Sequence, residues 1–349
     1  MHLFLLAPLL LWFLGITRAQ VGPGVVTGNT AVHDPTMCKD SSGKYFVFST
    51  GVGLEIRTSP DRVAFTFVGL VWPNGASWTD PFTLTSNGHC TLGPGLLLRE
   101  WRFPCNFTTP RRLSDLKTYG ISLSLRILTS ATFKSAIFYA TSSTGLPGSF
   151  TNHGLVTSTS SSNNYNAIDP KCVTKFLLGG LDSIRSVVLI LQKPFSGNWY
   201  LSLGSFWTGI KVESVSPSTG LSTSSVTSIA QRTANGGAIE ASVIYKHGSF
   251  YYLFTSWDLC CRGTSSTYNI RVGRSTSPTS GFVDQAGVAL TSGGGTLVLG
   301  THGSIVGPGG QDLMDDVDGS ILVYHYYTSS GSFLGINRLD FSSGWPVVV

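Results

Sequence analysis

The chain of 349 residues has little charge and few of the residues that favour helices. Asp, Glu, Lys and Arg together make up only 12% of it, whereas Gly alone occurs 41 times and aromatic residues contribute 11%. A chain poor in Glu, Lys and Ala but rich in Gly, Ser, Thr and aromatic residues disfavours long helices. It favours many short strands joined by turns, so we predict an all-β protein.

The cysteines do not form the pattern of a metal site. They show no Cys-x-x-Cys spacing and have no histidine at the distance typical of zinc ligands, so metal binding through sulfur is not expected. Cys260 and Cys261 are adjacent, and a bond between them would have to form inside the usual Cα separation. We assign no disulfide pairing from the sequence.

The net charge of +5 does not indicate a basic binding groove. The excess of Lys and Arg is concentrated in residues 88–134 and 171–195, and the rest of the chain carries a net negative charge. A nucleic-acid partner needs a basic stripe or patch that belongs to the fold. We therefore expect no nucleic-acid partner.

Only the N-terminus carries a long apolar run. Residues 3–16 are continuously apolar, and Thr17-Arg18-Ala19 follows as a suitable small-residue cleavage site. The run is shorter than the roughly 20 apolar residues that span a bilayer, which favours a signal peptide over a membrane helix. The charged residues that usually precede the apolar run of a signal peptide are missing here. We predict a signal peptide over residues 1–19 and a secreted, extracellular protein with no membrane partner.

A unit of a Gly-containing turn followed by aromatic and β-branched residues recurs along the chain. It is legible at residues 42–48, 197–201, 247–254 and 318–324. The last three units recur about every 50 to 70 residues, and such a spacing with several strands in each unit is typical of a β-propeller. We predict one domain over residues 20–349, a five-bladed β-propeller; a β-sandwich is the structural alternative.

Three acidic residues each stand in a short motif at the start of a strand-like run. Asp34 lies in His-Asp-Pro, Asp169 in Ile-Asp-Pro and Glu240 in Ile-Glu-Ala. Hydrolysis of a glycosidic bond needs one carboxyl group that protonates the leaving oxygen and another that activates water or attacks carbon. A third carboxyl group can separate the pKa values of the other two. One Asp-Pro pair alone merely starts a turn, but three such motifs beside many aromatic residues indicate a glycosidase.

These acids belong to a larger set of motifs: His33-Asp34-Pro35, Tyr165-Asn166-Ala167-Ile168-Asp169, residues 203–211, Ala238-Ile239-Glu240-Ala241, Cys260-Cys261-Arg262-Gly263, residues 266–271, Tyr324-His325-Tyr326-Tyr327 and Leu334-Gly335-Ile336-Asn337. Together the motifs resemble those of the fungal arabinan endo-1,5-α-L-arabinosidases of glycoside hydrolase family 43. The resemblance covers residues 30–87, 135–170 and 196–349. It implies a five-bladed propeller with the active site at its central axis. It also implies cleavage of internal 1,5-α-L-arabinofuranosidic bonds in plant cell-wall arabinan.

The resemblance also implies roles for the three acids. Asp34 matches the general base that activates water, and Glu240 matches the general acid that protonates the departing sugar oxygen. Asp169 matches the residue that orients Glu240 and tunes its pKa. The implied mechanism is inverting, which needs base and acid carboxyl groups about 6.5–9.5 Å apart, and it requires no cofactor.

Residues beside the acids are expected to bind the substrate: Trp207, Phe206, Asn166, Ser205 and Arg262. The two aromatic side chains would stack on furanose rings, and the three polar ones would bond to sugar hydroxyl groups. Tyr165 and Trp257 are further candidates for stacking. For each single aromatic residue, packing between the blades is the competing interpretation. We expect His33 to support Asp34 rather than to act in catalysis itself.

A structural cation near the axis stays an open alternative. Some members of the family hold one through a histidine in a Gly-Pro-Gly-His motif. This chain reads Gly307-Pro308-Gly309-Gly310-Gln311 at that place, and His302 is only a weak substitute. The sequence therefore leaves the metal ligands unknown.

Two segments depart from the family pattern. Residues 88–134 and 171–195 carry no family motif, and we expect no strand alternation in them. We interpret both as aberrant insertions, arising from translation out of frame or from a retained intron. Their presence would remove much of the second blade and weaken activity. Sequencing the spliced transcript tests this hypothesis.

Two other functions remain open at this point. An exo-acting α-L-arabinofuranosidase or β-xylosidase of the same fold would use the same three carboxyl groups. A noncatalytic carbohydrate-binding propeller would fit a damaged second blade. In each case we expect a monomer.

Overall fold

The computed structural model describes residues 20–40, 42–82, 106–107, 119–127, 134–174 and 198–349. These residues form strands and four short 3-10 helices, with no α-helix among them, so the prediction of an all-β protein is confirmed. Within the same ranges, no helix has the length and apolar character needed to cross a membrane. The predicted signal peptide lies outside the described residues and stays a prediction.

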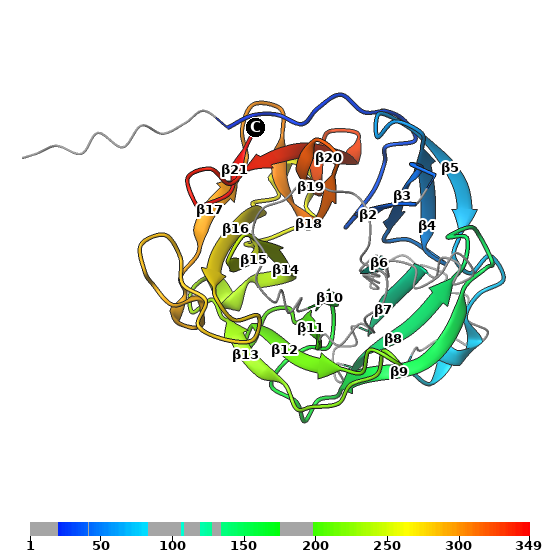
Figure 1. Ribbon diagram of the computed structural model, residues 1–349, viewed down its shortest axis with the longest axis horizontal. Coiled ribbons are helices and arrows are strands. Elements are labelled where there is room, and N and C mark those ends of the chain that lie inside the picture. The colour runs from blue at the N-terminus through cyan, green and yellow to red at the C-terminus, as the bar shows by residue number, and fades with distance from the viewer. Residues whose placement is uncertain (1–19, 41, 83–105, 108–118, 128–133, 175–197) are drawn as a thin grey trace, which may run out of the picture.

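The strands form five sheets that follow one another in chain order around a common centre (Figure 1). The first sheet contains β1 (Thr27–Gly28), β2 (Thr36–Lys39), β3 (Tyr45–Ser49), β4 (Glu55–Ser59) and β5 (Ala64–Leu70). The second contains β6 (Asn106–Phe107), β7 (Tyr119–Ile127), β8 (Lys134–Ser142) and β9 (Thr151–Thr159). The third contains β10 (Lys171–Thr174), β11 (Trp199–Leu203), β12 (Ile210–Val215) and β13 (Thr227–Ala230).

The fourth and fifth sheets complete the arrangement. The fourth contains β14 (Ile239–His247), β15 (Phe250–Trp257), β16 (Asn269–Ser275) and β17 (Thr296–Leu299). The fifth contains β18 (Val306–Asp316), β19 (Gly319–Thr328), β20 (Gly331–Asp340) and β21 (Val347–Val348). The 3-10 helices are η1 (Ser77–Phe82), η2 (Asn235–Gly237), η3 (Gly263–Ser265) and η4 (Leu290–Ser292).

Every neighbouring pair of sheets shares a buried apolar layer. Phe48 of the first sheet packs with Phe138 of the second, and Ile137 of the second packs with Leu201 of the third. Corresponding layers join the third sheet to the fourth, the fourth to the fifth, and the fifth to the first. Each fully buried side chain of this kind contributes about 1.5–3 kcal/mol. The five layers therefore hold the sheets around one centre.

The start of the chain connects the first sheet to the last. β1 pairs in parallel with β5, while the N–H of Gly24 donates to the carbonyl oxygen of Ile336 at 2.9 Å. Ala31 forms an isolated bridge with Phe333 of β20. The early residues thus reinforce the contact between the fifth and first sheets.

The expectation that residues 88–134 and 171–195 lack strands is wrong for their described parts. β7 pairs with β8 along its whole length, and β10 pairs with β11. In β7 the apolar residues Ile121, Leu123, Leu125 and Ile127 alternate with small or polar ones, which is the period-2 pattern of a strand. The rest of both segments lies outside the described residues, so their interpretation as aberrant insertions stays a prediction.

Lys171, the first residue of the second suspect segment, has a defined place at the centre. Its Nζ lies 2.9 Å from Asp312 Oδ2 on β18 and donates to the hydroxyl oxygen of Thr36 on β2 at 3.0 Å. All three side chains are buried. Lys171 thus links the third, fifth and first sheets.

Candidate active site

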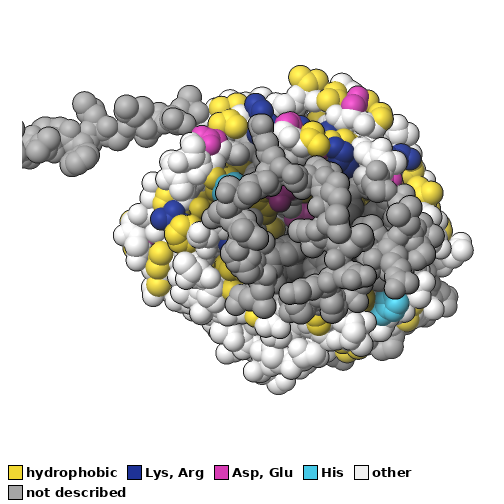
Figure 2. Space-filling view, viewed as in Figure 1, with side chains coloured by type: hydrophobic (Ala, Val, Ile, Leu, Met, Phe, Trp, Pro, Cys, Tyr) yellow, Lys and Arg dark blue, Asp and Glu magenta, His cyan; other side chains and the backbone are white. Residues whose placement is uncertain are grey.

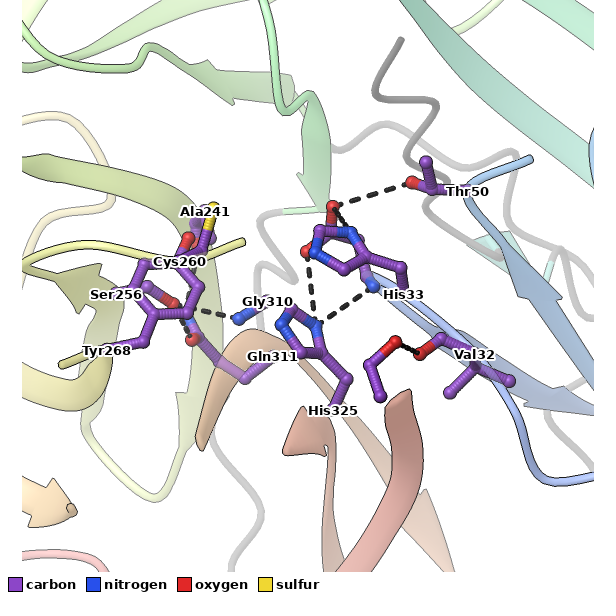
Figure 3. Close-up of polar contacts among 12 residues, drawn as sticks. Val32, His33, Thr50, Ala241, Ser256, Cys260, Tyr268, Gly310, Gln311 and His325 are labelled. Carbon is purple, nitrogen blue, oxygen red and sulfur yellow. Dashed lines mark hydrogen bonds and ion pairs between the residues drawn. The ribbon is translucent and has the colours of Figure 1, made fainter. Parts of the chain in front are cut away.

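Asp34 lies two residues before β2 and is buried, with 1% of its surface exposed. Its backbone N–H donates to Nδ1 of His325 on β19 at 3.0 Å. Its Oδ2 lies 2.8 Å from Nδ1 of His33 and 3.4 Å from the hydroxyl of Thr50. Two histidines and one hydroxyl group thus fix the position of this carboxyl group (Figure 3).

His33 is held in turn by aromatic neighbours. Its ring stacks on that of His325, with the centroids 4.1 Å apart, and its Nε2 lies 3.0 Å from the hydroxyl oxygen of Tyr327. That oxygen also accepts the N–H of Cys261 at 2.9 Å, and Cys261 forms a disulfide with Cys260. The position of His33 agrees with the expected support of Asp34.

Glu240 is the second residue of β14 and has 3% of its surface exposed. Its Oε2 accepts a hydrogen bond from the hydroxyl of Ser205 at 2.7 Å. Its Oε1 accepts one from the hydroxyl of Tyr268 at 2.6 Å. Two neutral hydroxyl groups therefore orient this carboxyl group.

Asp169 is fully buried and lies against the backbone next to Glu240. Its Oδ2 accepts the N–H of Ala241 at 3.0 Å. Asp169 therefore contacts the residue that follows Glu240 in β14. The contact matches the orienting position that the family resemblance implied.

The backbone is left-handed at each of the three acid motifs. Asp34 has φ 47°, Asp169 has φ 57° and Ala241 has φ 57°. Both aspartates also precede a proline, which further disfavours α conformations. Such conformations cost about 1–3 kcal/mol each and persist only where tertiary contacts enforce them, as they do at many functional sites.

Asp34 and the direct neighbours of Glu240 and Asp169 meet at one short stretch of β18. A Cβ atom on Gly310 would lie 2.1 Å from Oδ1 of Asp34, and one on Gly309 would lie 2.1 Å from the ring of Tyr268, the partner of Glu240. Asp34 and the Glu240–Tyr268 pair thus approach consecutive residues, while Asp169 reaches the same region through Ala241. Figure 2 shows acidic side chains inside the hollow at the centre of this face.

Phe206 and Trp207, predicted to stack on sugar rings, lie in the turn between β11 and β12. Trp207 is 39% exposed and Phe206 is half-buried. Nζ of Lys211 donates to the carbonyl oxygen of Thr208 at 2.6 Å and supports this turn, and burial lowers the pKa of that lysine. The position of Trp207 leaves its ring accessible.

The three polar residues predicted to bind sugar hydroxyl groups lie in different surroundings. Ser205 uses its hydroxyl on Glu240. Asn166 is buried and accepts a hydrogen bond from Ser135, whereas Arg262 is exposed. Their contacts with substrate stay predictions, and the bond made by Ser205 also gives it a part in orienting Glu240.

Trp257 and Tyr165, the further stacking candidates, are less accessible. Trp257 is 7% exposed, and the guanidinium groups of Arg232 and Arg271 lie 4.6 and 4.7 Å from the centre of its ring system. Tyr165 packs partly against the apolar layer between the second and third sheets, and burial raises its pKa. Both side chains fit packing better than sugar stacking.

His33, Asp34 and His325 have their potential ligand atoms within 4.8 Å of one another. However, Nδ1 of His325 accepts the N–H of Asp34, so its Nε2 carries the hydrogen that faces Tyr327 at 3.0 Å. As hydrogen-bonded here, the His325 ring offers no lone pair to a cation. His302 belongs to none of the compact ligand groups among the described residues. These side chains do not fit a directly ligated ion.

Sequence reasoning missed the roles of Tyr268, His325 and Gln311. The first two stand in motifs that carried the resemblance, but neither is a carboxyl group, and their contacts with Glu240 and Asp34 exist only in the folded protein. Gln311 appeared only as a departure from a family motif. The available signal was two glycines directly before it, which indicate a close approach to the backbone.

Comparisons with known proteins agree with this geometry. The sequence model of the family described as glycosyl hydrolases family 43 matches residues 189–346. A protein of Emericella nidulans named probable arabinan endo-1,5-α-L-arabinosidase A is 35% identical over 352 aligned residues, which cover 96% of both chains. The solved family 43 endo-arabinanase of Bacillus licheniformis has a TM-score of 0.75 and 31% identity, covering 93% of this chain and 99% of that one. An exo-1,5-α-L-arabinanase from a bovine ruminal metagenomic library has a TM-score of 0.74 and 27% identity, with 91% and 97% coverage. The chain therefore belongs to family 43 of the glycosyl hydrolases.

Proposed function

We propose that this protein is a secreted, monomeric hydrolase that cleaves internal 1,5-α-L-arabinofuranosidic bonds of plant cell-wall arabinan. In this proposal the five sheets are the blades of a propeller, with the active site at its axis. The observation that carries it is the approach of Asp34 and the Glu240–Tyr268 pair to consecutive residues of β18, with Asp169 bonded beside Glu240. Relatives named for arabinan cleavage support the choice of substrate.

The proposed reaction is inverting and moves two protons. Glu240 gives its proton to the departing sugar oxygen, while Asp34 takes a proton from the water that attacks the anomeric carbon. The hydroxyl groups of Ser205 and Tyr268 donate to Glu240 as a carboxylate, and either can accept from it as an acid. Asp169 holds the backbone beside Glu240. No cofactor takes part.

Substrate would lie across the same centre. Trp207 and Phe206 would stack on arabinofuranose rings, while Asn166, Ser205 and Arg262 would bond to hydroxyl groups at its edges. Trp207 has the accessible ring that this role needs.

The test is to incubate the full secreted chain with debranched arabinan and to follow both reducing ends and product sizes. Endo action should give a ladder of oligosaccharides in the first minutes. Glu240→Gln, which keeps the shape of the side chain, should abolish most of the release. Undiminished cleavage by this variant would remove Glu240 from the proposed role.

An exo-acting arabinanase is the second candidate, because one of the structural neighbours carries that name. It would release a product of a single small size from the chain ends and leave the polymer long. The same time course distinguishes the two modes. Binding of arabinan without new reducing ends would leave only a carbohydrate-binding role.

A further inference from the structure

β14 departs from its ladder directly after Glu240. Glu240 pairs with Ser256 on β15, but pairing resumes only at Val243 with Phe254, so Ala241 and the residue after it form a bulge. A bulge leaves peptide groups outside the ladder and re-aims the neighbouring side chain. Because Ala241 is buried, its N–H and its carbonyl oxygen both need partners from elsewhere.

Two side chains from other sheets supply these partners. Asp169 accepts the N–H of Ala241 at 3.0 Å, and Nε2 of Gln311 donates to its carbonyl oxygen at 2.5 Å. Gln311 is fully buried on β18. In Figure 3 its side chain extends from the fifth sheet toward Ala241 and Ser256. Ala241, the left-handed residue beside Glu240, is thus hydrogen-bonded through both its N–H and its carbonyl oxygen.

The amide of Gln311 is itself fixed in one orientation. The hydroxyl of Ser256 accepts the N–H of Gly310 at 3.0 Å and donates its single hydrogen to Oε1 of Gln311 at 2.6 Å. Oε1 is therefore the acceptor on that side, and the amino group must face Ala241. Ser256 on β15 is also the ladder partner of Glu240, so Gln311 contacts both β14 and the strand paired with it.

Gly310, the residue before Gln311, lies against the proposed general base, Asp34. Gly310 lies so close to Asp34 that a Cβ atom would stand 2.1 Å from Oδ1 of Asp34. One dipeptide of β18 therefore contacts the proposed base through Gly310 and the residue after the proposed acid through Gln311. A change in either contact alters how the two carboxyl groups face each other.

We propose that Gln311 is a positioning residue for the general acid: with Asp169 it holds Ala241 in the left-handed conformation and so sets the direction of Glu240 relative to Asp34. The inference rests on the proposed function of Glu240. Gln311 acts through the backbone of Ala241 and does not take part in proton transfer.

The main test is Gln311→Met, which keeps the length of the side chain and removes both polar atoms. We expect kcat on debranched arabinan to fall about tenfold to a hundredfold, because a displacement near 1 Å can cost that much, with KM little changed. Loss on an aryl arabino-oligosaccharide should be much smaller, since an aryl leaving group needs little protonation. Equal losses on both substrates, or an unchanged kcat, would overturn the inference.

Asn337→Leu is the matched control. Asn337 is a buried amide in the same sheet that accepts from the hydroxyl of Tyr324 and donates to the carbonyl oxygen of Gly22, both at 2.8 Å. It touches none of the three acids. We expect this variant to lose thermal stability while its kcat stays within about twofold of the wild type.

Gln311→Glu gives a second test with the same shape. Its ionised carboxylate would face the carbonyl oxygen of Ala241, whereas at low pH the protonated group can again donate to it. Activity relative to the wild type should therefore recover as the pH falls. A ratio that does not vary with pH would contradict the positioning role.

A crystal structure of either variant separates this inference from the proposed function. We expect Ala241 to leave the left-handed region and Glu240 to lose its contact with Ser205 or Tyr268. An unmoved Glu240 would sink the inference whatever the enzyme hydrolyses. A displaced Glu240 in a protein whose wild type never cleaves arabinan would sink only the proposed function.

Discussion

Asp34 and Glu240 are buried to nearly the same degree, yet different kinds of groups surround them. Asp34 lies between the imidazoles of His33 and His325 and near one hydroxyl group. Glu240 lies between the hydroxyls of Ser205 and Tyr268. The ring of His33 is fixed by stacking and by Tyr327, whereas a hydroxyl group can turn and exchange donation for acceptance.

The difference teaches how one site can assign two roles to similar carboxyl groups. A donor held in place, such as the Nδ1–H of His33, suits a base that must stay in one orientation until water reaches it. Adaptable hydroxyl groups suit an acid that alternates between protonated and ionised forms in each turnover. The variants below test this contrast.

The largest effect is expected from the two carboxyl groups themselves. Glu240→Gln and Asp34→Asn should each lower kcat on arabinan by about 10²–10⁴-fold, the usual contribution of general acid–base catalysis. On an aryl arabino-oligosaccharide only Glu240→Gln should regain much of the rate, because the leaving group no longer needs a proton. Steady-state rates on both substrates measure this. Recovery by Asp34→Asn instead would reverse the assignment.

Tyr268→Phe should have the next largest effect. It removes the donor to Oε1 of Glu240, and a hydrogen bond to a charged group contributes about 1.5–3 kcal/mol, or roughly tenfold to a hundredfold in rate. Tyr324→Phe, which removes a buried tyrosine hydroxyl bonded to Asn337, is the control for lost stability. If both variants slow turnover equally, the hydroxyl beside Glu240 has no special part.

His33→Phe should have a smaller effect of about two- to tenfold, because the hydroxyl of Thr50 still lies 3.4 Å from Oδ2 of Asp34 and can donate to it. The ring can still stack on His325, but its bond to Oδ2 of Asp34 is lost. Since the base acts on every substrate, the loss should be the same on arabinan and on the aryl compound. A selective loss on arabinan would place His33 with the acid instead.

Glu213 on β12 provides a buried carboxyl group outside the site, with little expected effect on turnover. Burial raises its pKa from 4.5 to about 7, against a single hydrogen bond from Ser222. The folded protein therefore binds more protons than the unfolded chain between these values, so stability should fall as pH rises from 4.5 to 7. The loss is on the order of 3 kcal/mol.

Glu213→Gln should flatten that dependence when thermal unfolding is measured at both ends of the pH range. Glu55→Gln, at a half-exposed carboxyl group paired with Arg57, is the matched control and should leave the dependence in place. An unchanged slope in the Glu213 variant would show that its carboxyl group is not the cause.

The sequence could predict the acids because each one stands in a local motif. Glu240 and Asp34 are also the residue types that the chemistry requires, so the motifs identified them as candidates, and the resemblance to family 43 supplied their separate roles. The all-β class followed from composition in the same way. The five sheets correspond to repeating units, of which the second was illegible.

The remaining parts depend on contacts between distant strands. The contacts of Tyr268 with Glu240 and of Gln311 with Ala241 form only in the folded protein, so the sequence does not reveal them. Nothing in Ala241 itself favours the left-handed backbone found in the bulge after Glu240. The strand at residues 119–127 was missed although its apolar residues alternate, because its neighbours in the sequence carry no such pattern. Local motifs therefore identify the acidic residues of the candidate site, whereas tertiary contacts determine the orientation of their side chains.

The contact between the residues around Gly22 and strand β20 also limits the order in which the protein can fold. Asn337 meets Gly22 across 315 positions of sequence, so this contact forms only after β20 has been synthesised. Contacts of such long range slow folding, because the entropy of closing the intervening loop must be overcome first. The residues around Gly22 thus reach their partners only when nearly the whole chain has been made, and the contact between the fifth and first sheets forms late, on the ribosome or after release.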